Sequence, residues 1–313
     1  MSALKEVLEV IDLLEDPKVD GSKVSEFLKE RGIEKVLVKE VKGEKAKTDF
    51  IKIILPGERG KSRGGDAPTL GVIGRLGGVG ARPSLKGMVS DADGAIVALA
   101  SALKIAELAS RGDVLNGDVI VTTHVCPSAP TRPHKPVPMM DSPVDMFTLL
   151  KMEVDKDMDA ILSIDATKAN RVINYTGFAI TPTVKEGWIL KVSDDLMDIY
   201  IRVVGSPPAI VPITMQDITP FTTKVYHINS IVQPWIYTKA PVVGVAITTL
   251  LPVPGSATGA TNAWALEQAT RFVVEVAKDF TAGNARFYDE EEWNTIQKVH
   301  GSVADIMKRG APP

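Results

Sequence analysis

Hydrophobic and polar positions in the N-terminal part of the chain predict one helix followed by two strands. Apolar residues recur every three or four positions over 4–14, which predicts an amphipathic helix that ends near Pro17. Apolar runs at 36–38 and 50–54 predict two strands joined by a lysine-rich turn. The glycine-rich segment 57–68 is predicted to be a loop. It does not match a phosphate-binding loop, because Leu55 stands where the first glycine of that motif is required.

From residue 69 onward, apolar strands alternate with helices. The pattern predicts strands at 69–74, 117–125, 159–164 and 242–250. A long, mostly apolar helix starts at Ser90, and further helical patterns cover 142–154 and 263–280. This alternation is typical of a mainly parallel sheet with helices on both faces. We therefore expect an α/β fold, a three-layer α/β/α sandwich with a mainly parallel mixed sheet.

The remaining segments give no sign that the chain is divided into separate domains. Residues 174–240 contain mixed strand patterns and one helix that opens at Ser193 and Asp194. No internal repeat and no convincing linker occurs. We expect a single α/β domain over 1–313, with its core at about 30–280 and a C-terminal helical appendage at 281–313.

Composition limits the classes of partner. The net charge of −3 gives no overall positive field that would indicate nucleic-acid binding. One cysteine cannot form an internal disulfide, which fits a reducing compartment. The first residues lack the apolar core of a signal peptide, and no run of eighteen apolar residues indicates a membrane span. The expected protein is cytoplasmic, with no nucleic acid and no membrane as partner.

Candidate functional residues follow the predicted strands, because ligands of open parallel sheets bind beyond the carboxyl ends of the strands. These ends carry Arg75, His124 and Asp165. Asp91 and Asp93, at the start of the long helix, reach the same edge if the connections are short. Helix capping is the simpler explanation for these two aspartates. Asp165 directly follows a buried strand, and a carboxylate there is costly unless it is paired or coordinated.

The segment 118–138 combines the only cysteine with histidines and prolines. Cys126 is either a small buried apolar residue or a nucleophile, and a nucleophile needs a base such as His124, two residues earlier on the same strand face. His134 lies in a loop stiffened by prolines, which is either a rigid crossover or a fixed contact. Arginines beside the strand ends could form an anion-binding wall, although surface arginines are common. They are Arg75, Arg82, Arg132 and Arg171.

Two sequence segments resemble the zinc exopeptidases of the aminopeptidase and deacylase superfamily. They are "SDADGAIVALASALKIAELASRGDVLNGDVIVTTHV" and "DAILSIDATKANRV", and the resemblance extends in order over about 69–280. The whole chain also resembles a family of unknown function, the domain of unknown function numbered 1177. The exopeptidase resemblance implies a three-layer α/β/α fold. It also implies that Asp91 matches the aspartate that bridges two metals and that Asp165 matches a later metal ligand.

The sequence departs from the exopeptidase pattern at the other metal positions. The strand at 69–74 is not followed by the His-x-Asp motif, "HVCPSAP" replaces the Glu-Glu pair, and "TTLLPVPGS" lacks the last histidine. A catalytic zinc needs about three protein ligands. One possibility is a rebuilt site in which His124 or His134 joins Asp91 and Asp165 around Mn²⁺, Zn²⁺ or Mg²⁺. The other is loss of the metal, with Arg75 paired to one of the two aspartates.

Two classes of function follow. The first is a divergent peptidase or amidohydrolase that acts on a small amide or peptide-like substrate, in which Asp93 assists proton transfer. Its substrate would contact Arg75, Arg82, Arg132 and Asn170. The second is a non-catalytic homologue that binds an anionic metabolite or a partner chain, and a Cys126 nucleophile is a distant third. A homo-oligomer is expected in either class.

Overall fold

The computed structural model describes residues 1–75, 88–126, 128–168, 170–172, 174–213, 228–301 and 303. The α-helices within these ranges are α1 (Leu4–Glu15), α2 (Gly21–Glu30), α3 (Asp93–Ser110), α4 (Met146–Glu153), α5 (Asp194–Val204), α6 (Ala263–Thr281) and α7 (Glu290–Val299). The 3₁₀ helices are η1 (Lys61–Arg63), η2 (Ser90–Ala92) and η3 (Ser230–Tyr237). The strands are β1 (Val36–Lys42), β2 (Lys47–Leu55), β3 (Leu70–Gly74), β4 (Val119–Val125), β5 (Thr131–Arg132), β6 (Met139–Met140), β7 (Ala160–Ala166), β8 (Gly177–Ile180), β9 (Val184–Lys185), β10 (Trp188–Ile189) and β11 (Val242–Thr248).

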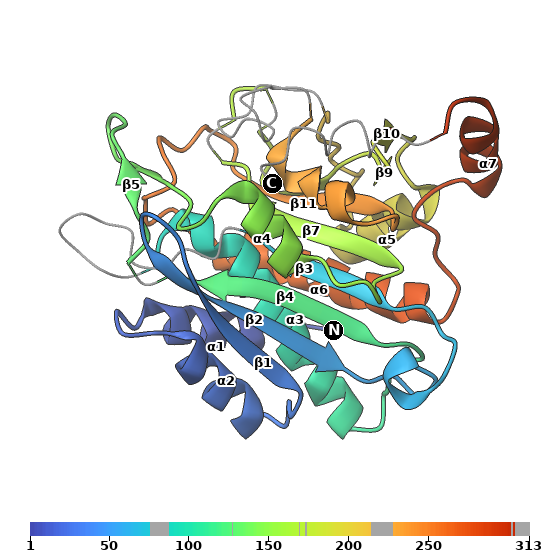
Figure 1. Cartoon of the computed structure of the whole chain (residues 1–313), viewed down its shortest axis with the longest axis horizontal. Helices are drawn as coiled ribbons and strands as arrows, with labels where there is room; N and C mark the ends of the chain where they lie inside the picture. Colours follow the sequence, from blue (N-terminus) through green and yellow to red (C-terminus); the bar gives the residue numbers. More distant parts are fainter. Residues whose placement is uncertain are drawn as a thin grey trace.

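A 9-stranded mixed sheet runs through the protein in the order β1-β2-β4-β3-β7-β11-β9-β10, and β8 also pairs with β11 (Figure 1). The central pairs β4–β3, β3–β7 and β7–β11 are parallel. The outer pairs are antiparallel. The four parallel strands are almost wholly buried and rich in β-branched residues, as expected for strands covered on both faces.

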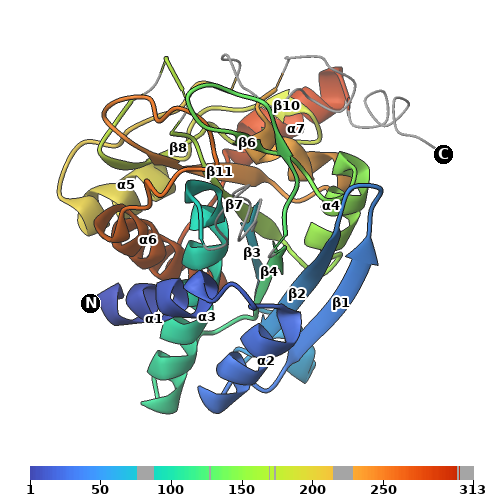
Figure 2. The same ribbon diagram turned by 90° about the vertical axis from the view of Figure 1, so that its left-hand side faces the viewer.

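Helices cover both faces of the sheet. α3 and α6 pack on one face, with α1 against both of them and α5 against α6. η3 packs on the other face beside α4. Figure 2 shows the sheet between these two helical layers. The predicted three-layer α/β/α fold is therefore confirmed, and its parallel part is the centre of the sheet.

Most predicted elements are present, with small shifts at their ends. The strand predicted at 117–125 begins at Val119. The carboxylate of Asp118, the residue before it, is buried and accepts hydrogen bonds from the backbone amides of Gly57 (2.9 Å) and Ser62 (2.7 Å). The helix predicted to open at Ser193 and Asp194 has Asp194 as its first residue. Ser193 is its N-cap and accepts a hydrogen bond from the Leu196 amide (3.1 Å).

The long helix begins differently from the prediction. Residues 90–92 form the short turn η2, and α3 starts at Asp93. Neither turn nor helix has a capping side chain at its first residue. Asp91 and Asp93 are thus not caps, and their burial needs another explanation.

The C-terminal part contains α7, which lies within the predicted appendage at 281–313, while 304–313 fall outside the described residues. That the chain forms a single domain over 1–313 stays a prediction. Among the helices that the structure describes, none is long and apolar enough to cross a bilayer.

Candidate functional site

The carboxyl ends of the parallel strands carry a buried group of charged side chains, here called the edge cluster. Its members are Asp91, Asp93, Asp165 and Lys168, with exposed fractions of 8%, 0%, 4% and 3%. The Lys168 ammonium forms an ion pair with Asp93 and donates to the Ala260 carbonyl oxygen (2.9 Å). Three of the four residues were candidates from the sequence, but Lys168 was not assigned a role.

A close contact between α3 and the sheet places the two aspartates at this edge. A side chain on Gly94 would lie 2.5 Å from the Ile164 carbonyl oxygen and 2.6 Å from that of Arg75. Only glycine allows this approach of the helix start to the ends of β3 and β7. Asp91 and Asp93 come just before Gly94 in the chain and are therefore carried to the end of β7, where Asp165 lies.

Burial and repulsion control the protonation of the aspartates. Burial raises the pKa of Asp91 well above its usual range, and the nearby carboxylates of Asp165 and Asp93 raise it further. Burial also raises the pKa of Asp93, while Lys168 and a hydrogen bond from the Thr261 hydroxyl (3.1 Å) oppose that shift. The Asp165 carboxylate therefore acts electrostatically on Asp91, and the metal-ligand roles that the exopeptidase resemblance implies for this pair stay a prediction.

The loop after β11 holds the edge cluster in place. The Val253 amide donates to the Lys168 carbonyl oxygen (2.7 Å). The Ser90 amide donates to the Thr258 carbonyl oxygen (2.7 Å), and Thr261 contacts Asp93. This loop contributes backbone and hydroxyl groups where the exopeptidase pattern has its last histidine.

A second charged group lies on the sheet face covered by α4 and η3. The guanidinium of Arg75 forms an ion pair with Glu153 (3.5 Å between Nε and Oε2), and both side chains are almost fully buried. Arg75 also donates to the Ser230 carbonyl oxygen. Gly74 faces α3, so Arg75, the next residue, points to the opposite face. Its ion-pair partner in the structure is Glu153, whereas the hypothesis of metal loss named Asp91 or Asp165.

His124 belongs to this second group. Its Nδ1 lies 2.8 Å from the Thr48 hydroxyl, its ring packs against Phe50, and its Nε2 has no hydrogen-bond partner among the described residues. Burial, with a smaller contribution from Arg75, lowers the pKa of His124 to about 4. The ring is therefore neutral near pH 7.

Cys126 and His134 are placed apart from the edge cluster. Cys126 is buried beside Val89 and Ala129, and its thiol donates to the Lys47 carbonyl oxygen (3.2 Å). Burial raises the pKa of this thiol to about 11, which opposes a role as nucleophile. His134 is exposed, and its Nδ1 contacts the Val137 carbonyl oxygen of its own loop (3.0 Å).

The remaining candidates vary in position. Arg132 lies exposed on β5, on the same proline-rich loop. Asn170 is buried, and its side-chain oxygen accepts from the Val172 amide (2.5 Å). Arg171 is exposed, and Arg82 lies outside the described residues.

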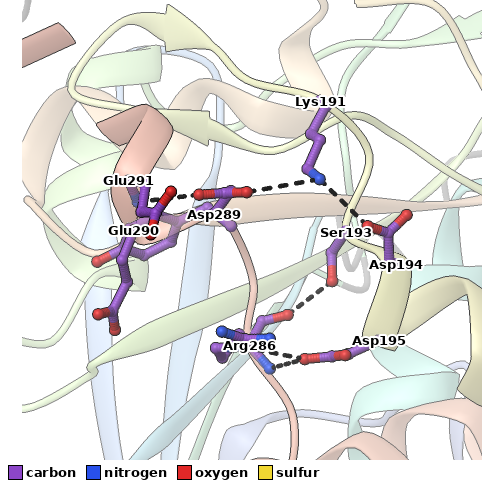
Figure 3. Close-up of a pocket in the computed structure, with 9 residues that line it drawn as sticks. Lys191, Ser193, Asp194, Asp195, Arg286, Asp289, Glu290 and Glu291 are labelled. Atoms are coloured by element: carbon purple, nitrogen blue, oxygen red, sulfur yellow. Dashed lines mark hydrogen bonds and ion pairs between the residues drawn. The ribbon is translucent and has the colours of Figure 1, made fainter. Parts of the chain in front are cut away.

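An acidic pocket of about 360 Å³ opens elsewhere, where α5 and α7 begin (Figure 3). Its charges are largely engaged with one another, since Lys191 pairs with Asp194 (3.2 Å) and Asp289 (3.6 Å). Asp289 also caps α7. The pocket is therefore explained by the junction of two helix starts.

The edge cluster does not fit the metal that the exopeptidase resemblance implies. The Lys168 ammonium pairs with the Asp93 carboxylate and also acts on the Asp91 carboxylate. Its positive charge would repel a divalent cation. Across the described ranges, no three His, Cys, Asp or Glu side chains are arranged to hold a metal ion. His124 and His134 do not complete such a group.

The comparison with family models identifies the chain's relatives. The model described as "Protein of unknown function (DUF1177)" matches residues 39–310. The chain belongs to this family. No curated protein matches its sequence.

Among solved structures, this DUF1177 chain is similar to an aminopeptidase, LapA of Legionella pneumophila. The two share 12% sequence identity with a TM-score of 0.44, and the match covers 88% of this chain. It spans 64% of the length of the aminopeptidase. At this distance the similarity says nothing about activity.

Proposed function

We propose that this DUF1177 chain binds a small peptide-like molecule at the edge cluster and does not hydrolyse it with a metal ion. The observation that carries the proposal is the buried ion pair between Lys168 and Asp93. In the exopeptidase resemblance, the neighbouring aspartates match metal ligands. Here a lysine supplies the positive charge at the same edge.

The charge balance favours a ligand with an amino or amide group. Lys168 is the positive charge that acts on Asp91 and Asp93 among the described residues, whereas the charge of Arg75 is balanced by Glu153. An additional anion would be repelled by the carboxylates, and a protonated amine would be attracted. The anionic metabolite expected from the sequence therefore fits this edge less well than a peptide-like molecule.

The test compares two ligands that differ only in the amino group. We expect alanyl-alanine to bind the protein in calorimetry without added metal and in the presence of a chelator. N-acetylalanyl-alanine should bind at least about tenfold more weakly, because it lacks the charge that the carboxylates attract.

Two variants locate the binding site. Asp165→Asn should weaken dipeptide binding, whereas Asp66→Asn, which alters an exposed pair with Arg59, should leave it unchanged. Equal binding of both ligands, or binding that requires metal, would contradict the proposal.

A metal-dependent amidohydrolase is the second candidate, and the repulsion between the Asp165 and Asp91 carboxylates supports it. It requires near-stoichiometric Mn, Zn or Mg in protein purified without chelator, and release of p-nitroaniline from an aminoacyl anilide. Asp165→Asn would abolish both. Metal-free protein with no such activity would reject this candidate.

A further inference from the structure

Strand β1 lies at one end of the strand order and, among the described residues, pairs with β2 alone. Figure 2 shows it at the outer margin of the protein. Residues 37–40 are all exposed, and the exposed fractions of Leu37 and Val38 are 59% and 39%. At the opposite end of the sheet β10 has two residues, and beside it the Val303 amide donates to the Glu186 carbonyl oxygen (3.1 Å). The long open margin of the sheet is therefore β1.

The backbone of β1 presents hydrogen-bonding groups on this open side. The Lys35 carbonyl oxygen, just before the strand, accepts a hydrogen bond from the Ile54 amide of β2 (3.0 Å). Successive residues of an antiparallel strand direct their backbone groups alternately to one side and to the other. The odd-numbered residues of β1 therefore bond to β2, and the amides and carbonyl oxygens of Val38, Glu40 and Lys42 point outward. Such outward groups are ready to pair with a further strand.

The side chains of β1 differ between its two faces. Val41 packs against the buried cluster that contains Phe50 and Leu149. Glu40 and Lys42 lie on the other face, because side chains alternate along a strand. Their charged groups are 3.8 Å apart, and the two side chains are 41% and 79% exposed. This part of β1 thus places an apolar residue between two opposite charges.

Charge limits how β1 can pair with the same strand of a second copy. A two-fold axis makes the two strands antiparallel, and each possible position of the axis places one residue of β1 opposite its own copy. An axis beside Lys39 or Lys42 places lysine opposite lysine, and an axis beside Glu40 places glutamate opposite glutamate. Like charges directly opposite one another destabilise a pair of strands. The valines are the remaining positions for the axis.

An axis beside Val38 is opposed by its neighbours. It would place the charged Lys39 opposite the apolar Leu37 of the second copy. Helix α2 also crowds this part of the strand, because a side chain on Gly21 would lie 2.5 Å from Cγ1 of Val38. The part of β1 beyond Val38 is therefore the better place for a second copy.

We infer that two copies of this chain form a two-fold dimer through β1, with the axis beside Val41. Glu40 of each copy then lies opposite Lys42 of the other copy, and cross-strand pairs of opposite charge stabilise a sheet. The outward backbone groups of Glu40 and Lys42 form the new antiparallel ladder, so that one sheet continues through both copies. The occupant of the open side is a second copy because the charges of β1 complement those of the same strand turned around.

Analytical ultracentrifugation of the full chain tests the dimer. We expect the measured mass to reach that of two chains by about 100 µM. Glu40→Lys places like charges opposite one another, as does Lys42→Glu, so each variant should weaken the dimer at least about tenfold. Glu40→Lys/Lys42→Glu exchanges the two charges and should restore the dimer.

The matched control is Asp66→Lys. Like Glu40→Lys, which removes an exposed ion pair with Lys47, it removes an exposed ion pair with Arg59 and changes the net charge by the same amount. It should leave the dimer unchanged. Thermal unfolding checks that each variant is folded, which is expected because the substituted side chains are exposed.

Amide hydrogen exchange gives a second measurement. The amides of Glu40 and Lys42 should exchange more slowly at high protein concentration than at low concentration, because the dimer covers them. This difference should disappear in Glu40→Lys.

A chain that stays monomeric up to about 100 µM would overturn the inference. A dimer that Glu40→Lys leaves intact would also overturn it, because another surface would then join the copies. So would a folded double variant that stays monomeric. Protection of the Glu40 and Lys42 amides in a monomeric chain, only after addition of an alternating valine–threonine peptide, would assign β1 to a different partner.

Discussion

Arg75 and Glu153 form an ion pair inside the protein, with side chains exposed by 1% and 0% and 3.5 Å between Nε and Oε2. The pair joins the end of β3 to the end of α4 and thus fixes one helical layer against the sheet. Burial raises the pKa of Glu153, and the attraction of Arg75 opposes this shift. A single substitution leaves one buried group without its partner.

Glu153→Gln should therefore destabilise the protein strongly. Removal of one partner of a buried pair costs about 3–5 kcal/mol, because the other charge is left uncompensated. Arg75→Met/Glu153→Leu should recover most of that loss, since it removes both charges. Urea unfolding of the single and double variants measures the difference, and a Glu153→Gln protein as stable as the wild type would refute the role of the pair.

His124 should make the stability depend on pH in the acid range. Its pKa is lowered from 6.5 to about 4 in the folded state, so the unfolded state binds the proton more tightly. The contribution of His124 to the free energy of unfolding should be complete above about pH 6.5. It should fall by roughly 3 kcal/mol as the pH drops to about 4.

Urea unfolding at a series of pH values measures this dependence. His124→Gln should flatten the curve between pH 6.5 and 4. The exposed His134 provides the matched control, and His134→Gln should leave the curve unchanged. An equal slope in the wild type and in His124→Gln would show that other groups cause the acid instability.

Gly94→Ala should destabilise the protein, although alanine is the better helix former. In an exposed helix the change stabilises by about 1 kcal/mol. Here the new Cβ would lie 2.5 Å from the Ile164 carbonyl oxygen, so α3 must move away from β3 and β7. Thermal unfolding gives the sign directly, and a raised midpoint would mean that the contact is not tight.

Cys126 should react with thiol reagents only when the protein unfolds. Burial hides the sulfur and raises its pKa to about 11, so roughly one thiol in a thousand is ionised at pH 8. Labelling with a disulfide reagent should be slow in buffer and fast in urea. Rapid labelling of the folded protein would restore Cys126 as a candidate nucleophile.

The local signals in the sequence were sufficient for much of the fold. Four apolar runs alternating with helices predicted the parallel strands β3, β4, β7 and β11, because buried parallel strands need continuous apolar residues. Ser193 was recognised as a helix start because capping depends on a few neighbouring residues. Strand-end position also identified Asp165, Arg75 and His124 as residues of the sheet edge.

The tertiary structure decided which charged side chains pair with one another. Arg75 pairs with Glu153, 78 positions later in the chain, and Asp93 with Lys168, because the sheet brings those segments together. His124 and Arg75 share the face covered by α4, which depends on the strand register and not on spacing alone. The sequence by itself determined which residues reach the edge of the sheet, through hydrophobic pattern and turn position. Only the packed structure decided which charges meet there, because an ion pair depends on the distance between two side chains in space.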